Sequence, residues 1–403
     1  MALAFRQLLS QGLTAFRKLA AIRARIAGTT PAEIAERRVT EGRSWEEFCD
    51  ALKAAGAVLS FPGAPSDPLN QAEGTRYLAR LARAALETFV ENADPAAPQL
   101  QRVVHETVKM GSDNPDNLYH NAPIAPERRY RLIGSRGTVH YLGFFTQAGS
   151  YGRGAGMSPT GRLDARELEL DDAGDFEIVV SRERSGVNWL PMTEATGTLI
   201  VRQTFLDRAR ETPAALRLEL LEGPATPAAL RAADLDAALR QSGDFVLGAS
   251  LLFAKWARDF QASTNELPLF DEATSTAFGG DPQIAYYHSY WRLGPQQALL
   301  VEVTPPICEN WNFQLNNHWM ESLDYRYFPI HLNKMSARCN AEGMVRIVVA
   351  HRDPGQPNWI STAGHHCGTM TLRWIRAESR PQPKTRVVRL DEWLREIGAN
   401  DER

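Results

Sequence analysis

Hydrophobic and polar positions follow the same order twice along this chain. The first copy runs from Phe176 to Gln203 and the second from Met344 to Ala377. Each copy contains an apolar run, an Asn-Trp pair in a turn-rich loop, and a Gly-Thr pair that opens an alternating strand. These pairs lie at 188–189 and 197–198 in the first copy and at 358–359 and 368–369 in the second. A supersecondary unit that recurs in this way predicts a duplicated β fold, in which the shared pairs serve the architecture.

Short apolar runs also alternate with Gly- and Pro-rich turns from Gly111 to about residue 207, and again from Asp281 onward. Strands of this length and spacing predict a sandwich or a barrel rather than a parallel sheet covered by helices. We therefore expect a mainly β fold with helical additions, built as a duplicated jelly-roll-like β-sandwich.

The duplication extends beyond the two copies. The segment from Tyr130 to Gly134 precedes a strand much as the segment from Trp291 to Gly294 does, so the repeat covers roughly 117–207 and 284–378. Five parts of the chain follow from this interpretation: a helical N-terminal arm at 1–110, a first β half at 111–207, a helical connection at 208–282, a second β half at 283–380, and a tail with a short helix at 381–403.

Helical spacing of apolar residues dominates before Gly111. Ala32 to Ala55 predicts a helix that Thr30 caps, that Pro31 opens and that Gly42 interrupts. Asn70 to Asn92 predicts another helix.

The spacing of apolar and basic residues over 1–26 predicts a basic amphipathic helix, and this stretch contains no acidic residue. Such a helix can lie on an anionic membrane surface, which makes peripheral membrane contact one possible role. Packing against its own protein or another subunit is the favoured role, and we expect a homo-oligomer.

Composition narrows the classes of function. The formal net charge of -3 provides no basic surface for nucleic acid, and four widely spaced cysteines indicate neither a zinc ribbon nor a disulfide framework. The glycine-rich stretch at 149–156 does not match a dinucleotide-binding or P-loop motif, and we read it as a loop near a pocket mouth. We expect a cytoplasmic protein that needs no cofactor.

The densest polar and aromatic stretch runs from Cys308 to Lys334. Strand alternation places Asn312, Gln314 and Asn316 on one face of a sheet, where they either face solvent or hold a substrate. Convergent amides flanked by aromatic rings are typical of a small-molecule pocket. The expected substrate-binding residues are Asn312, Gln314, Asn316, Trp319 and Tyr325.

General acid/base chemistry is the most economical catalytic hypothesis. A histidine that titrates near neutrality, His318 or His365, would transfer a proton, and Asp353 would orient or assist it. Glu309 could replace Asp353. A metal site is the alternative, with His365, His366 and Cys367 joined by His318, His331 or His351, but the spacing lacks a metal-binding motif.

The chain resembles the bacterial family labelled domain of unknown function 1214 over about residues 110–378. The resemblance rests on NPDNLYHNAPI at 114–124, NWLP at 188–191, YWRLG and VEVTPP within 290–306, and DPGQPNWISTAGHHCGTMTLRW at 353–374. It implies a tandem β-sandwich, often paired with the 1254 domain, and an association with lipid, steroid or aromatic catabolism. It assigns no catalytic residues.

Two functions follow as hypotheses. The first is a cofactor-independent lyase, hydratase or hydrolase that acts on a hydrophobic or aromatic small molecule, in a pocket where the second β half meets the helices. The second is a non-enzymatic protein that binds a lipid or a small molecule, or acts as a scaffold. A His-ligated metal enzyme is a further alternative.

Overall fold

The computed structural model describes residues 30–148, 157–223, 227 and 229–401. The basic helix expected at 1–26 and the glycine-rich loop at 149–156 lie outside these ranges. Among the helices that are described, none combines the length and the apolar character needed to cross a membrane.

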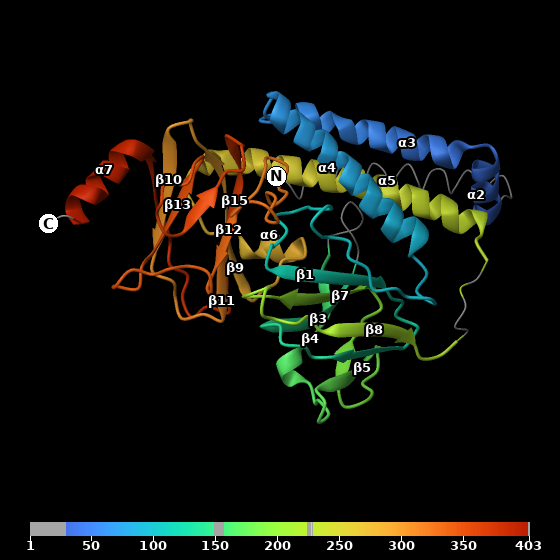
Figure 1. The fold of residues 1–403 in the computed structure, drawn as a ribbon. Helices are drawn as coiled ribbons and strands as arrows, with labels where there is room; N and C mark the ends of the chain where they lie inside the picture. Colours follow the sequence, from blue (N-terminus) through green and yellow to red (C-terminus); the bar gives the residue numbers. More distant parts are fainter. Residues whose placement is uncertain (1–29, 149–156, 224–226, 228, 402–403) are drawn as a thin grey trace.

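The described residues contain four sheets of four strands each. Two sheets belong to a first sandwich and two to a second (Figure 1). The first sandwich contains β1 (Asn117–Pro123), β2 (Tyr130–Ser135), β3 (Tyr141–Ala148), β4 (Pro159–Asp164), β5 (Asp175–Ser181), β6 (Trp189–Pro191), β7 (Thr196–Thr204) and β8 (Ala215–Leu220). The second contains β9 (Ile284–Arg292), β10 (Gln297–Val303), β11 (Asn310–Leu315), β12 (His331–Asn333), β13 (Val345–Ala350), β14 (Trp359–Ser361), β15 (Cys367–Ile375) and β16 (Lys384–Arg389).

The two sandwiches have the same topology. The strand orders are β1-β7-β3-β4 and β6-β5-β2-β8 in the first sandwich, and β9-β15-β11-β12 and β14-β13-β10-β16 in the second. Adding eight to each strand number of the first sandwich therefore gives its counterpart in the second. Even the parallel pair of each sandwich, β5 with β6 and β13 with β14, recurs. The predicted duplicated β fold is confirmed.

Strand register confirms one sequence alignment and corrects another. Val180 pairs with Leu190 as Val349 pairs with Ile360, so the alignment of the two copies is right. The alignment of Tyr130 with Trp291 is wrong, because Tyr130 lies in β2, whereas Trp291 lies in β9, the counterpart of β1. Apolar-rich strands have similar sequences, so only the pairing of the strands shows which strands of the two copies correspond. The edge strands β8 and β16 lie beyond the expected limits at 207 and 380.

The repeated asparagines hold equivalent loops. The side-chain amide of Asn188 donates to the carbonyl oxygens of Glu169 and Glu177, and that of Asn358 donates to those of Arg338 and Arg346. Asn358 also adopts a left-handed backbone with φ of 59°, which asparagine tolerates better than most residues.

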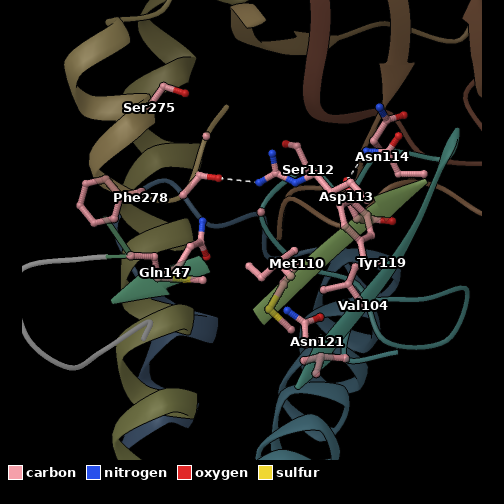
Figure 2. Close-up of a pocket in the computed structure, with 18 of the residues that line it drawn as sticks. Val104, Met110, Ser112, Asp113, Asn114, Tyr119, Asn121, Gln147, Ser275 and Phe278 are labelled. Carbon is pink, nitrogen blue, oxygen red and sulfur yellow. Dashed lines mark hydrogen bonds between the residues drawn. The ribbon is translucent and has the colours of Figure 1, made fainter. Parts of the chain in front are cut away.

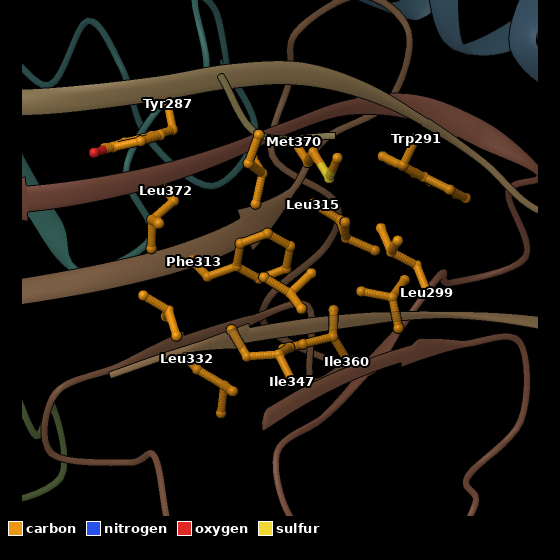
Figure 3. Close-up of a cluster of buried hydrophobic side chains, with 14 of the residues drawn as sticks. Tyr287, Trp291, Leu299, Phe313, Leu315, Leu332, Ile347, Ile360, Met370 and Leu372 are labelled. Carbon is orange, nitrogen blue, oxygen red and sulfur yellow. The ribbon is translucent and has the colours of Figure 1, made fainter. Parts of the chain in front are cut away.

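Each sandwich encloses its own apolar core. In the second sandwich Trp311, Phe313 and Leu315 point inward from β11 and meet side chains of the opposite sheet. Figure 3 shows Phe313 among Ile347, Leu372 and other core residues. Alternation along β11 therefore sends its amide residues to the outer face of the sandwich.

Helices cover one side of both sandwiches (Figure 1). The long helix α5 (Ala232–Phe260) contacts α2 (Pro31–Thr40), α3 (Arg43–Ala55) and α4 (Pro68–Leu86), and it also touches β9 and β15. Gly74 of α4 lets Trp319 approach so closely that an added Cβ would lie 2.5 Å from its indole ring. The helices are α2 (Pro31–Thr40), α3 (Arg43–Ala55), α4 (Pro68–Leu86), α5 (Ala232–Phe260), α6 (Glu272–Ala277) and α7 (Leu390–Asp401).

The predicted helix signals act as expected. Thr30 and Glu33 form a capping box at the start of α2, with Pro31 in the first turn. Gly42, with φ of 78°, separates α2 from α3.

Charged side chains join the two sandwiches at one edge. Arg376 of the second sandwich binds both Asp164 of the first sandwich and Glu309. Arg166 of the first sandwich also reaches Glu309, at 3.1 Å. This network holds the outer faces of the two sandwiches in a fixed relation.

We expect Asn188→Ala to lower the free energy of unfolding by about 1–3 kcal/mol, because it leaves backbone groups of its loop without partners. Asn358→Ala should cost about 1 kcal/mol more, because alanine tolerates a left-handed backbone poorly. Urea denaturation measures both losses. Equal losses for the two variants would contradict the assigned role of the Asn358 backbone.

Candidate functional site

A cavity of about 260 Å³ lies where the two sandwiches meet α5. Its walls come from the outer faces of β1 and β7, from β9 and β15, from α5, and from the segments around residues 103–117 and 275–280. Figure 2 shows Gln147, Ser275 and Phe278 on one side and Met110, Tyr119 and Asn121 on the other. The cavity therefore contains residues from both copies of the duplicated fold.

One wall of the cavity is aromatic. Phe253 and Trp256 of α5 pack edge to face with ring centroids 5.9 Å apart, and Phe278 packs on Trp256 at 5.2 Å. Gly111 comes so close to Phe253 that an added Cβ would lie 2.8 Å from the ring, which explains a glycine at this position. This wall is suited to a flat apolar molecule. The remaining apolar lining residues include Phe89, Val103, Val104, Met110, Met157, Ile200, Phe245 and Ile284.

The sheets contribute two equivalent Tyr-Arg pairs. Tyr119 lies directly opposite Arg202 across β1 and β7, and Tyr286 lies opposite Arg373 across β9 and β15. All four residues line the cavity. Because cross-strand partners share one face of a sheet, the duplication places one pair in each of two facing sheets.

Arg202 has an acidic partner. Its guanidinium lies 3.3 Å from Asp281, donates to the carbonyl oxygen of Gly279 at 3.0 Å, and lies over the ring of Phe145. Burial opposes its charge, but the carboxylate of Asp281 and the nearby hydroxyl groups of Tyr286, Tyr119 and Tyr141 together offset that effect and raise the pKa of Arg202.

Arg373 has only neutral partners at contact distance. It donates to the side-chain oxygens of Asn312 and Gln314, at 3.2 and 2.6 Å, and to the carbonyl oxygen of Ser112. Its exposed fraction is 4%. Among the described residues, its hydrogen-bond acceptors are these three neutral oxygens.

The predicted amide row exists, but it is buried. Asn312, Gln314 and Asn316 lie on the outer face of β11 as expected, and all three are inaccessible to solvent. They bind the segment that precedes β1: Asn312 donates to Asn114, and Gln314 donates to the carbonyl oxygen of Asp113. None of the three amides lines the cavity. The three side chains therefore contact a segment of their own chain and not the cavity in which a substrate could lie.

His318 and Trp319 lie under α4. Nδ1 of His318 lies 3.0 Å from the hydroxyl of Tyr290, and the indole N–H of Trp319 donates to the carbonyl oxygen of Asn70. Burial, aided by Arg292, lowers the pKa of His318 to about 4, so this histidine is neutral at pH 7. Neither residue lines the cavity.

The other two expected catalytic residues are separated from each other. His365 lies near α4, with Nε2 3.7 Å from Glu73, whereas Asp353 is exposed and accepts the backbone N–H of Gly355. Burial alone would raise the pKa of Glu73, but His365 and Arg76 bring it down to about 2. None of the predicted trio of His318, His365 and Asp353 is among the described residues that line the cavity.

Tyr325 belongs to a further environment, because the ammonium of Lys109 lies 4.6 Å from its ring centroid. Burial raises the pKa of Tyr325. As for metals, the described part of the chain contains no group of three or more His, Cys, Asp or Glu side chains placed to hold an ion.

Sequence reasoning missed the residues that line the cavity. A usable signal was present, since an arginine interrupts the apolar strand at the same position of both copies, as Arg202 and Arg373. Charged residues are rarely buried in the middle of a strand without a partner, so this recurrence marks a polar site.

Comparison with known proteins identifies a relative without an assigned function. The chain is 48% identical to an uncharacterized protein from Burkholderia cenocepacia, over 88% of this chain and 99% of that one, with a TM-score of 0.86. It therefore belongs to the same family as that protein. The VPA0106 protein from Vibrio parahaemolyticus is 11% identical, over 84% of this chain and all of that one, with a TM-score of 0.45.

No family model and no curated protein matches the chain. The resemblance to domain of unknown function 1214 therefore stays a prediction.

Gln314→Leu should lower the free energy of unfolding by about 2–4 kcal/mol, because it deprives both Arg373 and the carbonyl of Asp113 of a buried partner. The same change at the exposed Gln296 should cost less than about 0.5 kcal/mol. Urea denaturation of both variants tests this difference. Equal losses would show that the amide row does not hold the segment in place.

The neutral state of His318 makes stability depend on pH. The folded protein resists protonating this imidazole, whereas the unfolded chain protonates it near its ordinary pKa of 6.5. The stability that neutral His318 provides is therefore present above pH 6.5 and is lost as the pH falls toward 4. In His318→Gln, the free energy of unfolding should therefore decrease by up to about 3 kcal/mol less over this pH range than in the unmodified protein.

Denaturant unfolding at several pH values between 7 and 4 measures this effect. His366→Gln, at an exposed histidine, should keep the pH dependence of the unmodified protein. An unchanged dependence in His318→Gln would contradict the assignment.

Proposed function

We propose that this relative of the uncharacterized Burkholderia cenocepacia protein binds a small, mainly apolar or aromatic molecule in the cavity between the two sandwiches. The observation that carries this proposal is the lining, in which the aromatic wall of α5 accompanies two Tyr-Arg pairs. Apolar walls with a few oriented polar groups are the usual composition of ligand sites.

The size of the cavity limits the molecule. Its 260 Å³ exceeds the roughly 150 Å³ of an engineered cavity that binds benzene, and lies just below the range of about 300–1,000 Å³ that holds drug-sized ligands. A ligand of one or two fused rings, or a short branched chain, fits this range.

A polar atom without a partner supports the same interpretation. Gln147 lines the cavity with an exposed fraction of 3%, and its side-chain oxygen has no hydrogen-bond partner among the described residues. An unsatisfied buried acceptor is costly, so a hydroxyl or N–H group of a bound molecule would stabilise it.

Binding is favoured over the acid/base enzyme expected from the sequence. His318, His365 and Asp353 lie outside the cavity lining, and none of them could reach a molecule bound there without rearrangement. A lyase or hydrolase would have to use other lining residues, among which Asp113 supplies a carboxyl group and Tyr119 and Tyr286 supply phenol groups.

Filling the cavity tests this proposal. We expect the neutral probe 2-naphthamide to bind the unmodified protein, and Ile200→Trp to weaken that binding by about tenfold or more, because the indole occupies the space next to β7. Isothermal titration calorimetry measures both affinities.

Ile307→Trp is the matched control, because Ile307 is 74% exposed and lies outside the cavity lining. Its affinity should equal that of the unmodified protein. Undiminished binding to Ile200→Trp, or failure of both 2-naphthamide and 2-naphthoate to bind the unmodified protein, would refute the proposed site.

A further inference from the structure

The two Tyr-Arg pairs occupy equivalent positions of the duplicated fold, but only Arg202 has an acidic partner. We propose that the ligand of the cavity carries a carboxylate, which pairs with Arg373; this inference rests on the proposed binding function. The ligand class is a compact aromatic or apolar carboxylic acid, bound in its ionised form.

The position of the acidic partner of Arg202 has a counterpart in the other copy. Asp281 precedes Tyr286 by five residues, as Asn114 precedes the equivalent Tyr119. The side-chain oxygen of each accepts the backbone N–H two residues later, at 2.9 Å for Asp281 and 3.0 Å for Asn114. The same turn therefore opens both copies.

Arg373 lacks a counterion because an asparagine stands where the other copy has an aspartate. Arg202 of the first copy pairs with Asp281 of the second, whereas the position in the first copy that corresponds to Asp281 holds the neutral Asn114. A buried guanidinium normally has an anionic partner, because removing a charge from water is costly.

Arg373 also has free donors. Its Nε–H bonds to no described residue, and its four terminal N–H groups meet only three acceptors. The guanidinium is thus held in place by neutral oxygens while part of it remains available. A carboxylate is the group that matches such a planar donor set best.

The nearby acids are occupied elsewhere. Asp113 accepts the backbone N–H and the hydroxyl of Ser322. Burial raises the pKa of Asp113, and of the two cations that oppose this rise, Lys109 acts more strongly than Arg373. Asp116 accepts from Asn333 and from Asn312, so it reaches Arg373 only through the Asn312 amide. Neither carboxylate makes direct contact with Arg373.

A matched pair of probes tests the charge requirement. 2-Naphthoate and 2-naphthamide share the ring system and differ in charge, and isothermal titration calorimetry compares their affinities for the unmodified protein. We expect 2-naphthoate to bind about tenfold to a hundredfold more tightly, which is the range for hydrogen bonds to charged groups. Equal affinities would overturn the carboxylate inference and leave the binding function intact, whereas failure of both probes to bind would overturn both.

Asn114→Asp restores the missing counterion inside the protein. This variant keeps the acceptor that Asp116 and Asn312 use, so the fold should persist. We expect its preference for 2-naphthoate to disappear while 2-naphthamide binds as before. A retained preference would overturn the assignment to Arg373.

The control for this change is Asn340→Asp, at an exposed asparagine whose side-chain oxygen likewise accepts the N–H two residues later. It should keep the full preference. Loss of the preference in this control would also overturn the inference, because it would show that added negative charge at any position suffices.

Discussion

The hydrogen-bond network between β11, β15 and the segment from Ser112 to Asp116 is the constraint on which the site depends. Three buried amides and one buried guanidinium on the face of the second sandwich need partners, and this segment accepts a hydrogen bond from each of the four. Leaving such groups unpaired would cost several kcal/mol in total. The network therefore holds the start of the first sandwich against the face of the second, and the cavity forms beside this contact.

The duplicated fold has two equivalent sheet faces, and these faces differ in their residues at equivalent positions. In the second copy, positions 312, 314 and 316 hold Asn, Gln and Asn; the equivalent positions of the first copy hold Gly143, Phe145 and Gln147. The amides fill the face of the second sandwich with internal bonds. Of the three residues on the first, only Gln147 lines the cavity, whose sheet lining comes mainly from β1 and β7.

The sequence predicted the fold better than the site. The repeat of the Asn-Trp and Gly-Thr pairs revealed the duplication, because those pairs serve local loops and strands within one copy. Alternation also placed Asn312, Gln314 and Asn316 on one face. Their burial could not be predicted, since the covering segment lies about two hundred residues earlier in the chain. The surroundings of His318 and His365 could not be predicted for the same reason, because helix α4, which covers them, comes from a distant part of the sequence.

A crystal structure of the protein with 2-naphthoate would show whether the cavity holds a carboxylic acid against Arg373. We expect electron density for the ring system against Phe253 and Trp256, with the carboxylate at hydrogen-bond distance from Arg373. Density for the probe elsewhere, with the cavity occupied only by water, would contradict it.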